Sequence, residues 1–209
     1  GSLLAIATSQ SYVERLPLGQ ARIALLAEGT DWHSLNLLGA ILVPRPRFAM
    51  VGLSQAFDHR WRPGPPGIHP QACVEPGAEI GPGARIGAFC HIAAGAVLGE
   101  NAWLGSHVTL GEGCTIGPEA TLMAGVRIGA EVRIGARFIA HPGAVIGGDG
   151  FSFVTPERSA IENVRETLGD SKGAKPQAFA RIHSLGSVVI GDDVELGANS
   201  CIDRGTIRD

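Results

Sequence analysis

The residues best suited to chemistry gather where a regular repeat in this 209-residue chain is interrupted. Asp149, Phe151 and Phe153 alternate along one short run, and His183 lies where the regular pattern is about to resume. A carboxylate can accept hydrogen bonds from the polar groups of a ligand, and aromatic rings can form the apolar side of a binding pocket. The rings can equally serve to pin a loop. We therefore treat Asp149, Phe151, Phe153 and His183 as candidate substrate-binding residues.

The element that must position these residues is a six-residue repeat. Fourteen blocks run without a break from Ile68 to Phe151, and the same register returns from Ile190 to Ile207. The first position is almost always a large aliphatic residue, the second is usually glycine, and the fifth is small or valine-like. A fixed short period of this kind is typical of a parallel β-helix.

The repeat has a steric explanation. Each block supplies a short strand and a corner, three blocks make one triangular coil, and strand pairing stacks the coils about 4.8 Å apart. We expect the first-position side chains, from Ile68 onwards, to point into the narrow interior. Ile86, Leu104 and Leu122 are spaced by whole coils, so they should form one column. Phe138 occupies a fifth position that is otherwise small, and it needs room beside Ala140.

Four histidines fall within the blocks, and their positions argue against a metal site. His69 and His141 share one face but lie four coils apart, too far to bind one ion. His91 and His107 point outward in adjacent coils and could approach each other across one face. The chain also has no C-x-x-C pair, so the sequence predicts neither a metal nor a redox site.

The residues before the repeat predict a second, smaller fold. Segments 22–28 and 40–44 have the buried runs of strands, and 47–57 has the pattern of a helix. We therefore expect a partial α/β domain over residues 1–61.

The rest of the chain divides by composition. Residues 62–67 read Arg-Pro-Gly-Pro-Pro-Gly and predict a linker. Residues 68–209 then form the β-helix, with an excursion at about 152–186. The fold class is thus mainly β: a parallel β-helix of hexapeptide repeats preceded by a small α/β domain. Long insertions into repeat arrays often lie on a binding face.

Composition excludes several classes of function. The formal net charge is −3, which gives no indication of nucleic-acid binding. No apolar run is long enough for a membrane span, and we see no secretory signal. Cys90 and Cys114 fall at the small inward position and predict reduced core thiols. These features together favour a cytoplasmic protein.

Two motifs resemble a known family. The run 143–153, GAVIGGDGFSF, and the run 189–205, VIGDDVELGANSCIDRG, stand in the order found in UDP-3-O-acylglucosamine N-acyltransferases of lipid A biosynthesis. The resemblance covers residues 68–209 well and the N-terminal part loosely. It implies a left-handed β-helix that assembles as a homotrimer, with the active site in the groove between subunits.

The resemblance also implies a reaction. A 3-hydroxyacyl chain would move from an acyl carrier protein thioester to the 2-amine of UDP-3-O-acylglucosamine, with no other cofactor and no metal. A histidine acts as general base in that family, in a block that follows the IDRG run. We expect this histidine beyond Asp209, and we expect the 209 residues alone to lack the activity.

The N-terminal domain carries a weaker part of the resemblance. The family holds the uracil ring with an FxxNxxY-like segment, and the matching run here extends from Ile6 to Tyr12. Tyr12 is retained, whereas Ile6 replaces the aromatic residue and Ser9 replaces the asparagine. The resemblance therefore implies Ser9 and Tyr12 as substrate-binding residues, while Tyr12 could instead only pack within the domain.

Two other functions are compatible with the same fold. The chain could be a non-catalytic trimeric scaffold that binds a nucleotide sugar. It could also be a sugar acetyltransferase that uses acetyl-CoA, although the paired motifs argue against that reaction. Folds of this kind host many activities, so the site must decide.

Overall fold

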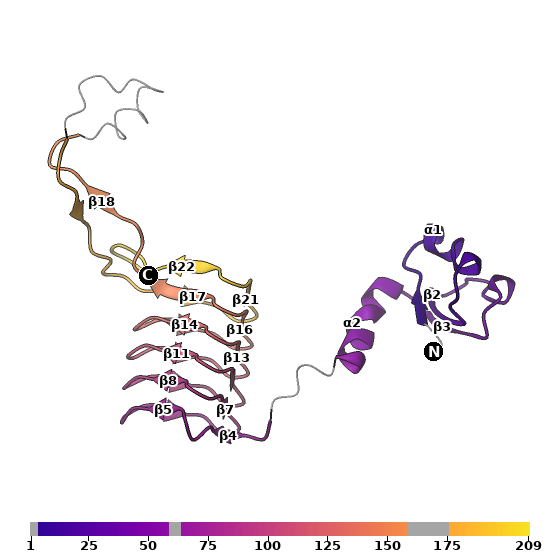
Figure 1. Ribbon diagram of the computed structural model, residues 1–209, viewed down its shortest axis with the longest axis horizontal. Coiled ribbons are helices and arrows are strands. Elements are labelled where there is room, and N and C mark those ends of the chain that lie inside the picture. The colour runs from indigo at the N-terminus through magenta and orange to yellow at the C-terminus, as the bar shows by residue number, and fades with distance from the viewer. Residues whose placement is uncertain (1–3, 59–63, 159–175) are drawn as a thin grey trace. The chain divides into compact units, whose positions relative to one another are not determined.

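The chain folds into two compact units, Gly1–Arg62 and Pro63–Asp209. The computed structural model describes residues 4–58, 64–158 and 176–209, and Figure 1 shows the elements of each unit. None of the helices in these ranges has the length and hydrophobicity needed to cross a membrane.

Unit 1 is a small α/β fold around a parallel sheet. Its strands lie in the order β1-β2-β3, and the central strand is the most buried, with Ala24, Leu25 and Leu26 inaccessible to solvent or nearly so. The strand β2, the strand β3 and the helix α2 lie where the sequence predicts them, within one residue at each end. The elements are β1 (Leu4–Ile6), α1 (Gln10–Val13), η1 (Leu16–Leu18), β2 (Ile23–Ala27), η2 (His33–Leu35), β3 (Gly39–Val43) and α2 (Pro46–Phe57).

The helix α2 begins and ends for local reasons. Pro46 occupies the first turn, where a missing N–H costs nothing and the fixed φ suits a helix. Asp58 has extended backbone angles, so the helix stops at Phe57.

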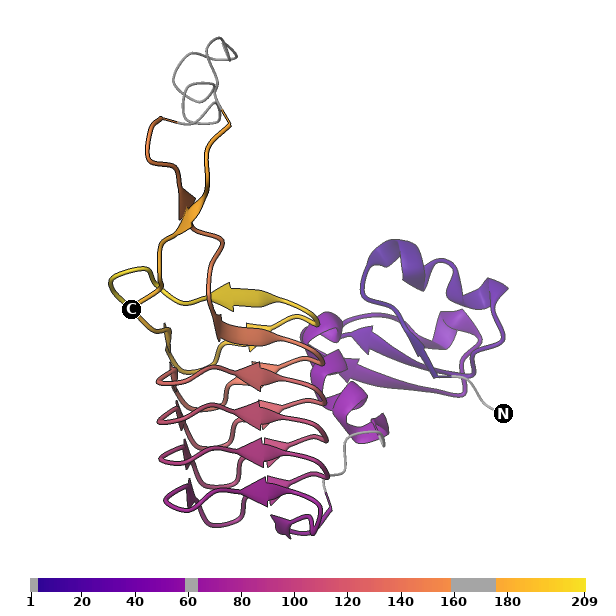
Figure 2. The ribbon, with the colours of Figure 1, turned by 60° about the vertical axis from the view of Figure 1, so that its left-hand side comes forward.

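Unit 2 is a triangular parallel β-helix, whose stacked coils are visible in Figure 2. Three parallel sheets form its faces. The first face contains β4 (Gly67–Ile68), β7 (Arg85–Ile86), β10 (Trp103–Leu104), β13 (Thr121–Leu122), β16 (Ile139–Ala140) and β21 (Glu195–Leu196). The second contains β5 (Cys73–Val74), β8 (His91–Ile92), β11 (Thr109–Leu110), β14 (Arg127–Ile128), β17 (Val145–Gly148) and β22 (Cys201–Asp203). The third contains β6 (Glu79–Ile80), β9 (Val97–Leu98), β12 (Thr115–Ile116), β15 (Arg133–Ile134) and β20 (Val189–Ile190).

Strand pairing confirms the predicted coil. Leu104 pairs with Ile86 in the coil before and with Leu122 in the coil after. All three side chains are buried, so they form the predicted interior column. The predicted fold class, a β-helix of hexapeptide repeats preceded by a small α/β region, is confirmed.

The first coil departs from the prediction that every first-position residue lies inside. Ile68 is 49% exposed, and Val74 and Ile80 are only partly buried. Each coil buries its apolar row against its neighbours, and the described residues place no coil beneath the first one. The prediction for Ile68 is therefore wrong.

The unusual Phe138 is accommodated inside the coils. Its side chain is fully buried, as are Ala120 and Ala140. Ala120 occupies the corresponding position one coil earlier, and Ala140 is the smallest of the first-position residues. Small neighbours thus provide the volume that the large ring takes up.

The excursion leaves the coils after β17 and returns to them before β20. Its base is a short antiparallel ladder in which β18 (Phe153–Val154) pairs with β19 (Ala180–Arg181). Residues 159–175, in the middle of the predicted excursion, lie outside the described residues.

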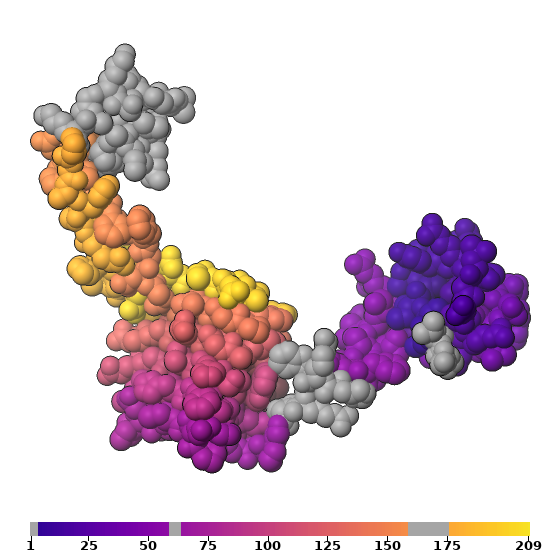
Figure 3. Space-filling view, viewed as in Figure 1, coloured from indigo at the N-terminus to yellow at the C-terminus, as the bar shows by residue number. Residues whose placement is uncertain are grey.

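At the other end of the unit, Gly67 of the predicted linker already pairs in β4. In the space-filling view the coils form one closely packed body (Figure 3).

Candidate functional site

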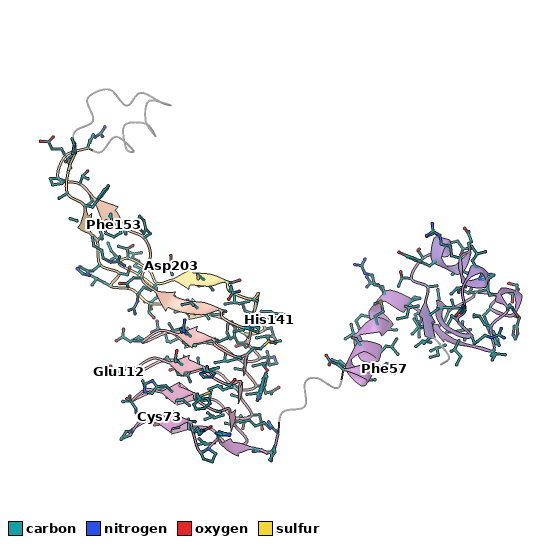
Figure 4. All side chains as sticks on the ribbon, viewed as in Figure 1. Phe57, Cys73, Glu112, His141, Phe153 and Asp203 are labelled. Carbon is teal, nitrogen blue, oxygen red and sulfur yellow. The ribbon has the colours of Figure 1, made fainter. Side chains whose placement is uncertain are left out.

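The base of the excursion brings three of the predicted residues together. The Phe151 and Phe153 rings lie 4.8 Å apart between centroids. Arg181 lies over the Phe153 ring at 5.4 Å, and its Nη2 atom is 3.3 Å from Asp149 Oδ2. Figure 4 shows Phe153 on the excursion and Asp203 on the last coil near its base. One cation thus links the acid and an aromatic ring.

Arg181 is a site residue that the sequence reasoning missed. The antiparallel ladder places it opposite Phe153, and it also donates a hydrogen bond to the Gly150 carbonyl at 3.4 Å. In the sequence, the only feature that distinguishes Arg181 is its position two residues before His183. Its pairing partner, Phe153, is far away along the chain. The contacts fix the direction in which the excursion leaves the coils.

The aromatic side chains at this base remain open to solvent. Phe151 is 94% exposed and Phe153 is 40% exposed. Phe179 is also exposed and packs edge-on against Phe153, with 6.4 Å between centroids. These rings contact one another, and Arg181 contacts Phe153, so together they form an apolar surface that can contact an acyl chain or a sugar ring.

The last coil contacts the segment that returns from the excursion. Arg204 donates one hydrogen bond to the Gly186 carbonyl at 2.8 Å and another to the Ala130 carbonyl at 3.2 Å. Asp203 lies beside Gly150, where a Cβ would come within 3.4 Å of its carboxylate. Arg204 therefore joins the returning segment to the coils, whereas Asp203 keeps a carboxylate near the excursion.

His91 is held by a carboxylate on the second face. Its Nε2 atom is 2.9 Å from Glu75 Oε1, and the other oxygen of Glu75 accepts a hydrogen bond from the Ala94 N–H. The bond from Ala94 and the bond from His91 together hold the pKa of the Glu75 carboxyl below its ordinary value of 4.5. This pair joins the first coil to the second.

The other outward histidines have different surroundings. His107 occupies a corner and stacks on Phe89, with 5.0 Å between ring centroids, so it does not share a partner with His91. His141 Nε2 lies 2.7 Å from Glu195 Oε1. His183 is exposed at the return of the excursion.

Unit 1 contains a pocket around Tyr12. Its volume is about 420 Å³, and it lies against the strand β1 and the turn that follows α1. The lining includes Ile6 and Tyr12, the two ends of the run that resembles a uracil-binding segment. Ser9 is not part of this lining; its hydroxyl lies 2.9 Å from the Ser11 hydroxyl.

Comparison with known families defines the class of protein. The bacterial transferase hexapeptide family (six repeats) matches residues 95–130 and 107–137. The hexapeptide repeat of succinyl-transferase matches residues 187–207. Both matches fall on the coils described above, so unit 2 is a β-helix of the hexapeptide-repeat class.

Nearly the whole chain also aligns with particular enzymes of this class. It is 62% identical to the UDP-3-O-acylglucosamine N-acyltransferase of Ruegeria pomeroyi and 66% identical to that of Paracoccus denitrificans, over 208 residues in each case. The resemblance of this chain to the UDP-3-O-acylglucosamine N-acyltransferase family is thereby confirmed. The alignments include 98% of this chain and 56% of each relative, so the chain spans little more than half of their length.

A solved structure is similar at a greater distance. The Arabidopsis UDP-N-acetylglucosamine acyltransferase matches 65% of this chain and 48% of its own, with 23% sequence identity and a TM-score of 0.44.

Proposed function

We propose that this chain is part of an N-acyltransferase that moves a 3-hydroxyacyl chain from acyl carrier protein to the 2-amine of UDP-3-O-acylglucosamine, a step of lipid A biosynthesis in the cytoplasm. The observation that carries the proposal is the identity of 62% and 66% to two such enzymes over 98% of the chain. The four cysteines, all unpaired, favour the cytoplasmic location.

The two candidate sites would divide the substrate between them. We propose that Tyr12 packs on the uracil ring in the pocket of unit 1, with Ser9 nearby. At the base of the excursion, Phe151 and Phe153 would contact an acyl chain, whereas Asp149 and His183 would bind the sugar. The exposed aromatic rings support contact with an acyl chain. Asp149, which Arg181 links to Phe153, and the exposed His183 support binding of the sugar.

The catalytic base is assigned by the resemblance alone. The amine must lose a proton as it attacks the thioester, which calls for a base near neutral pKa. In the family this histidine belongs to a block after the IDRG run, so we do not give the role to His91, which is paired with Glu75.

We further propose that the β-helix assembles as a homotrimer. Trp103, Val97 and Ile139 point outward from the faces yet are only partly exposed, and Phe89 is half exposed at a corner. Packing between copies would cover apolar groups of this kind. Analytical ultracentrifugation should detect a species of three chains, and a monomer at high concentration would contradict the assembly.

A chimera tests the activity directly. The 208 aligned residues of the Ruegeria pomeroyi enzyme are replaced with this chain, and acyl transfer is measured with an acyl carrier protein thioester and UDP-3-O-acylglucosamine. We expect turnover similar to that of the unmodified relative. The relative itself is the positive control, and the 209 residues alone show how much of the reaction this segment supports.

The result that would overturn the proposal is equally specific. A chimera that folds and assembles like the relative, but transfers no acyl group, would show that this chain does not serve the reaction. Retention of nucleotide-sugar binding in that chimera would then favour a binding scaffold.

A further inference from the structure

The pocket around Tyr12 contains a cation whose role is unassigned. Arg15 lines this pocket together with Tyr12 and Gln20. The Arg15 N–H donates a hydrogen bond to the Tyr12 carbonyl at 3.2 Å, so the helical turn of α1 continues through Arg15. Side chains three residues apart in such a turn lie on one face, about 5–6 Å apart at their Cβ atoms. Tyr12 and Arg15 therefore face the same space.

The charge of Arg15 is not neutralised by its surroundings. Within the part of unit 1 that the structure describes, no carboxylate forms an ion pair with Arg15. The neighbouring Glu14 is engaged by Gln10, whose Nε2 lies 3.4 Å from its carboxylate. No acidic residue occurs among the described residues that line the pocket. The pocket thus offers an aromatic ring beside an unpaired guanidinium.

A second, smaller pocket extends the same surface. Its volume is about 270 Å³, and it shares Leu16, Gly19, Gln20 and Ala21 with the first. Arg22 and Asn36 line its other side, and again none of its described lining residues is acidic. A ligand that extends past Arg15 would therefore meet further hydrogen-bond donors and a second positive charge.

We propose that Arg15 binds the anionic diphosphate of a nucleotide whose base packs on Tyr12. The inference rests on the proposed function, because the uracil position is taken from it. Tyr12 and Arg15 line the same pocket, so a nucleotide whose base packs on the ring would bring its phosphates toward the guanidinium. A guanidinium presents a fork of N–H donors that suits phosphate oxygens. Arg15 would thus select the nucleotide over the free nucleoside.

Titration calorimetry on the full chain tests the role of Arg15. Uridine, UMP and UDP are titrated into the unmodified chain, Arg15→Gln and Arg15→Lys. We expect UDP to bind more tightly than uridine, and Arg15→Gln to weaken UDP binding roughly tenfold while leaving uridine binding unchanged. Arg15→Lys should retain most of the UDP affinity, because it retains the charge. Salt should weaken UDP binding more than uridine binding.

The matched control is Arg47→Gln, which removes an exposed arginine of α2 that does not line either pocket. It should leave UDP binding unchanged. If UDP binds but Arg15→Gln weakens UDP and uridine equally, or weakens neither, the role of Arg15 is overturned and the proposed reaction is untouched. If the unmodified chain binds no UDP, the nucleotide pocket is wrong as a whole, while the chimera still tests the acyl transfer separately.

Discussion

Depth within a coil controls the chemistry of the cysteine side chains. Cys90 and Cys114 point into the coils, as the sequence predicts, and are buried, whereas Cys73 and Cys201 point outward and are exposed. Burial raises the pKa of the Cys114 thiol to about 11 and also raises the pKa of the Cys90 thiol. A thiol that is buried and protonated reacts slowly, because the thiolate is the nucleophile.

The first prediction follows from this contrast. An aromatic disulfide reagent at pH 8 should modify Cys73 and Cys201 quickly, and Cys90 and Cys114 only when the protein unfolds. Peptide mapping by mass spectrometry identifies the modified residues. Fast modification of Cys114 in the native protein would contradict its place in the core. Denatured protein, in which all four thiols react, is the control.

A second prediction concerns Phe138. Phe138→Ala leaves a cavity in a closely packed interior, so it should lower the free energy of unfolding by about 3–5 kcal/mol. Phe151→Ala makes the same chemical change at a side chain that is 94% exposed, and it should cost much less. Urea denaturation followed by circular dichroism measures both. Equal losses in the two variants would show that the interior tolerates the cavity.

A third prediction concerns Glu75. Folding lowers the pKa of this carboxyl below 4.5 through the Ala94 N–H and His91. The stabilisation is therefore present above the unfolded-state pKa and is lost as the pH falls through the lower folded-state pKa. Glu75→Gln should flatten the decrease in stability below about pH 4.5. Urea midpoints from pH 6 to pH 3 test this, with Glu79→Gln as the exposed control.

At the level of the element, the corners of the third face control how closely the coils approach. A Cβ added to Gly117 would lie 2.4 Å from the carbonyl of Gly135 in the next coil. The same addition at Gly191 would meet nothing within 4 Å. The glycines at the second position of the blocks thus permit close stacking. Apart from Gly147, their φ angles lie outside the left-handed region, so the requirement is one of contact and not of backbone angle.

The fourth prediction compares these two glycines. Gly117→Ala must displace backbone in the neighbouring coil, so it should destabilise the protein by about 1–3 kcal/mol. Gly191→Ala occupies the equivalent position in open space and should have little effect. Thermal unfolding of both variants measures the difference. A Gly117→Ala protein as stable as Gly191→Ala would contradict the observed coil spacing.

At the level of the whole molecule, each unit closes its own core. The buried cluster of unit 1 includes Ala7, Ala24 and Leu26. The buried cluster of unit 2 includes the interior column that contains Ile86 and continues along the coils as far as Val188. The two clusters share no residue. We therefore expect the coils to stay folded when the packing inside unit 1 is disrupted.

The fifth prediction follows from these separate cores. A chain that begins at Gly64 should retain the circular dichroism of the β-helix and unfold at nearly the same temperature as unit 2 does in the full chain. Differential scanning calorimetry measures the two transitions. Loss of the β-helix signal in the shorter chain would show that unit 1 supports the coils. A full chain carrying Leu26→Asp, which disrupts only unit 1, provides the complementary control.

The sequence by itself determined the coil, because a six-residue period allows few structures. The inward positions of Ile86, Cys90 and Phe138 follow from their place in the block, since each block repeats one local conformation. The extent of α2 could also be predicted, because Pro46 and the residues around Asp58 mark its ends locally. The end coil was the exception, since the burial of Ile68 depends on a neighbour that the period does not supply.

Only the tertiary structure decided how the candidate site is assembled. Arg181 meets Asp149 and Phe153 through an antiparallel pairing across the excursion, and no local pattern specifies that register. The His91–Glu75 pair likewise joins residues from successive coils, and Arg15 lines a pocket with Tyr12 only because the chain folds around it. Contacts between residues distant along the chain depend on which surfaces pack together. For that reason, the repeat could predict the fold but not the partners of its charged side chains.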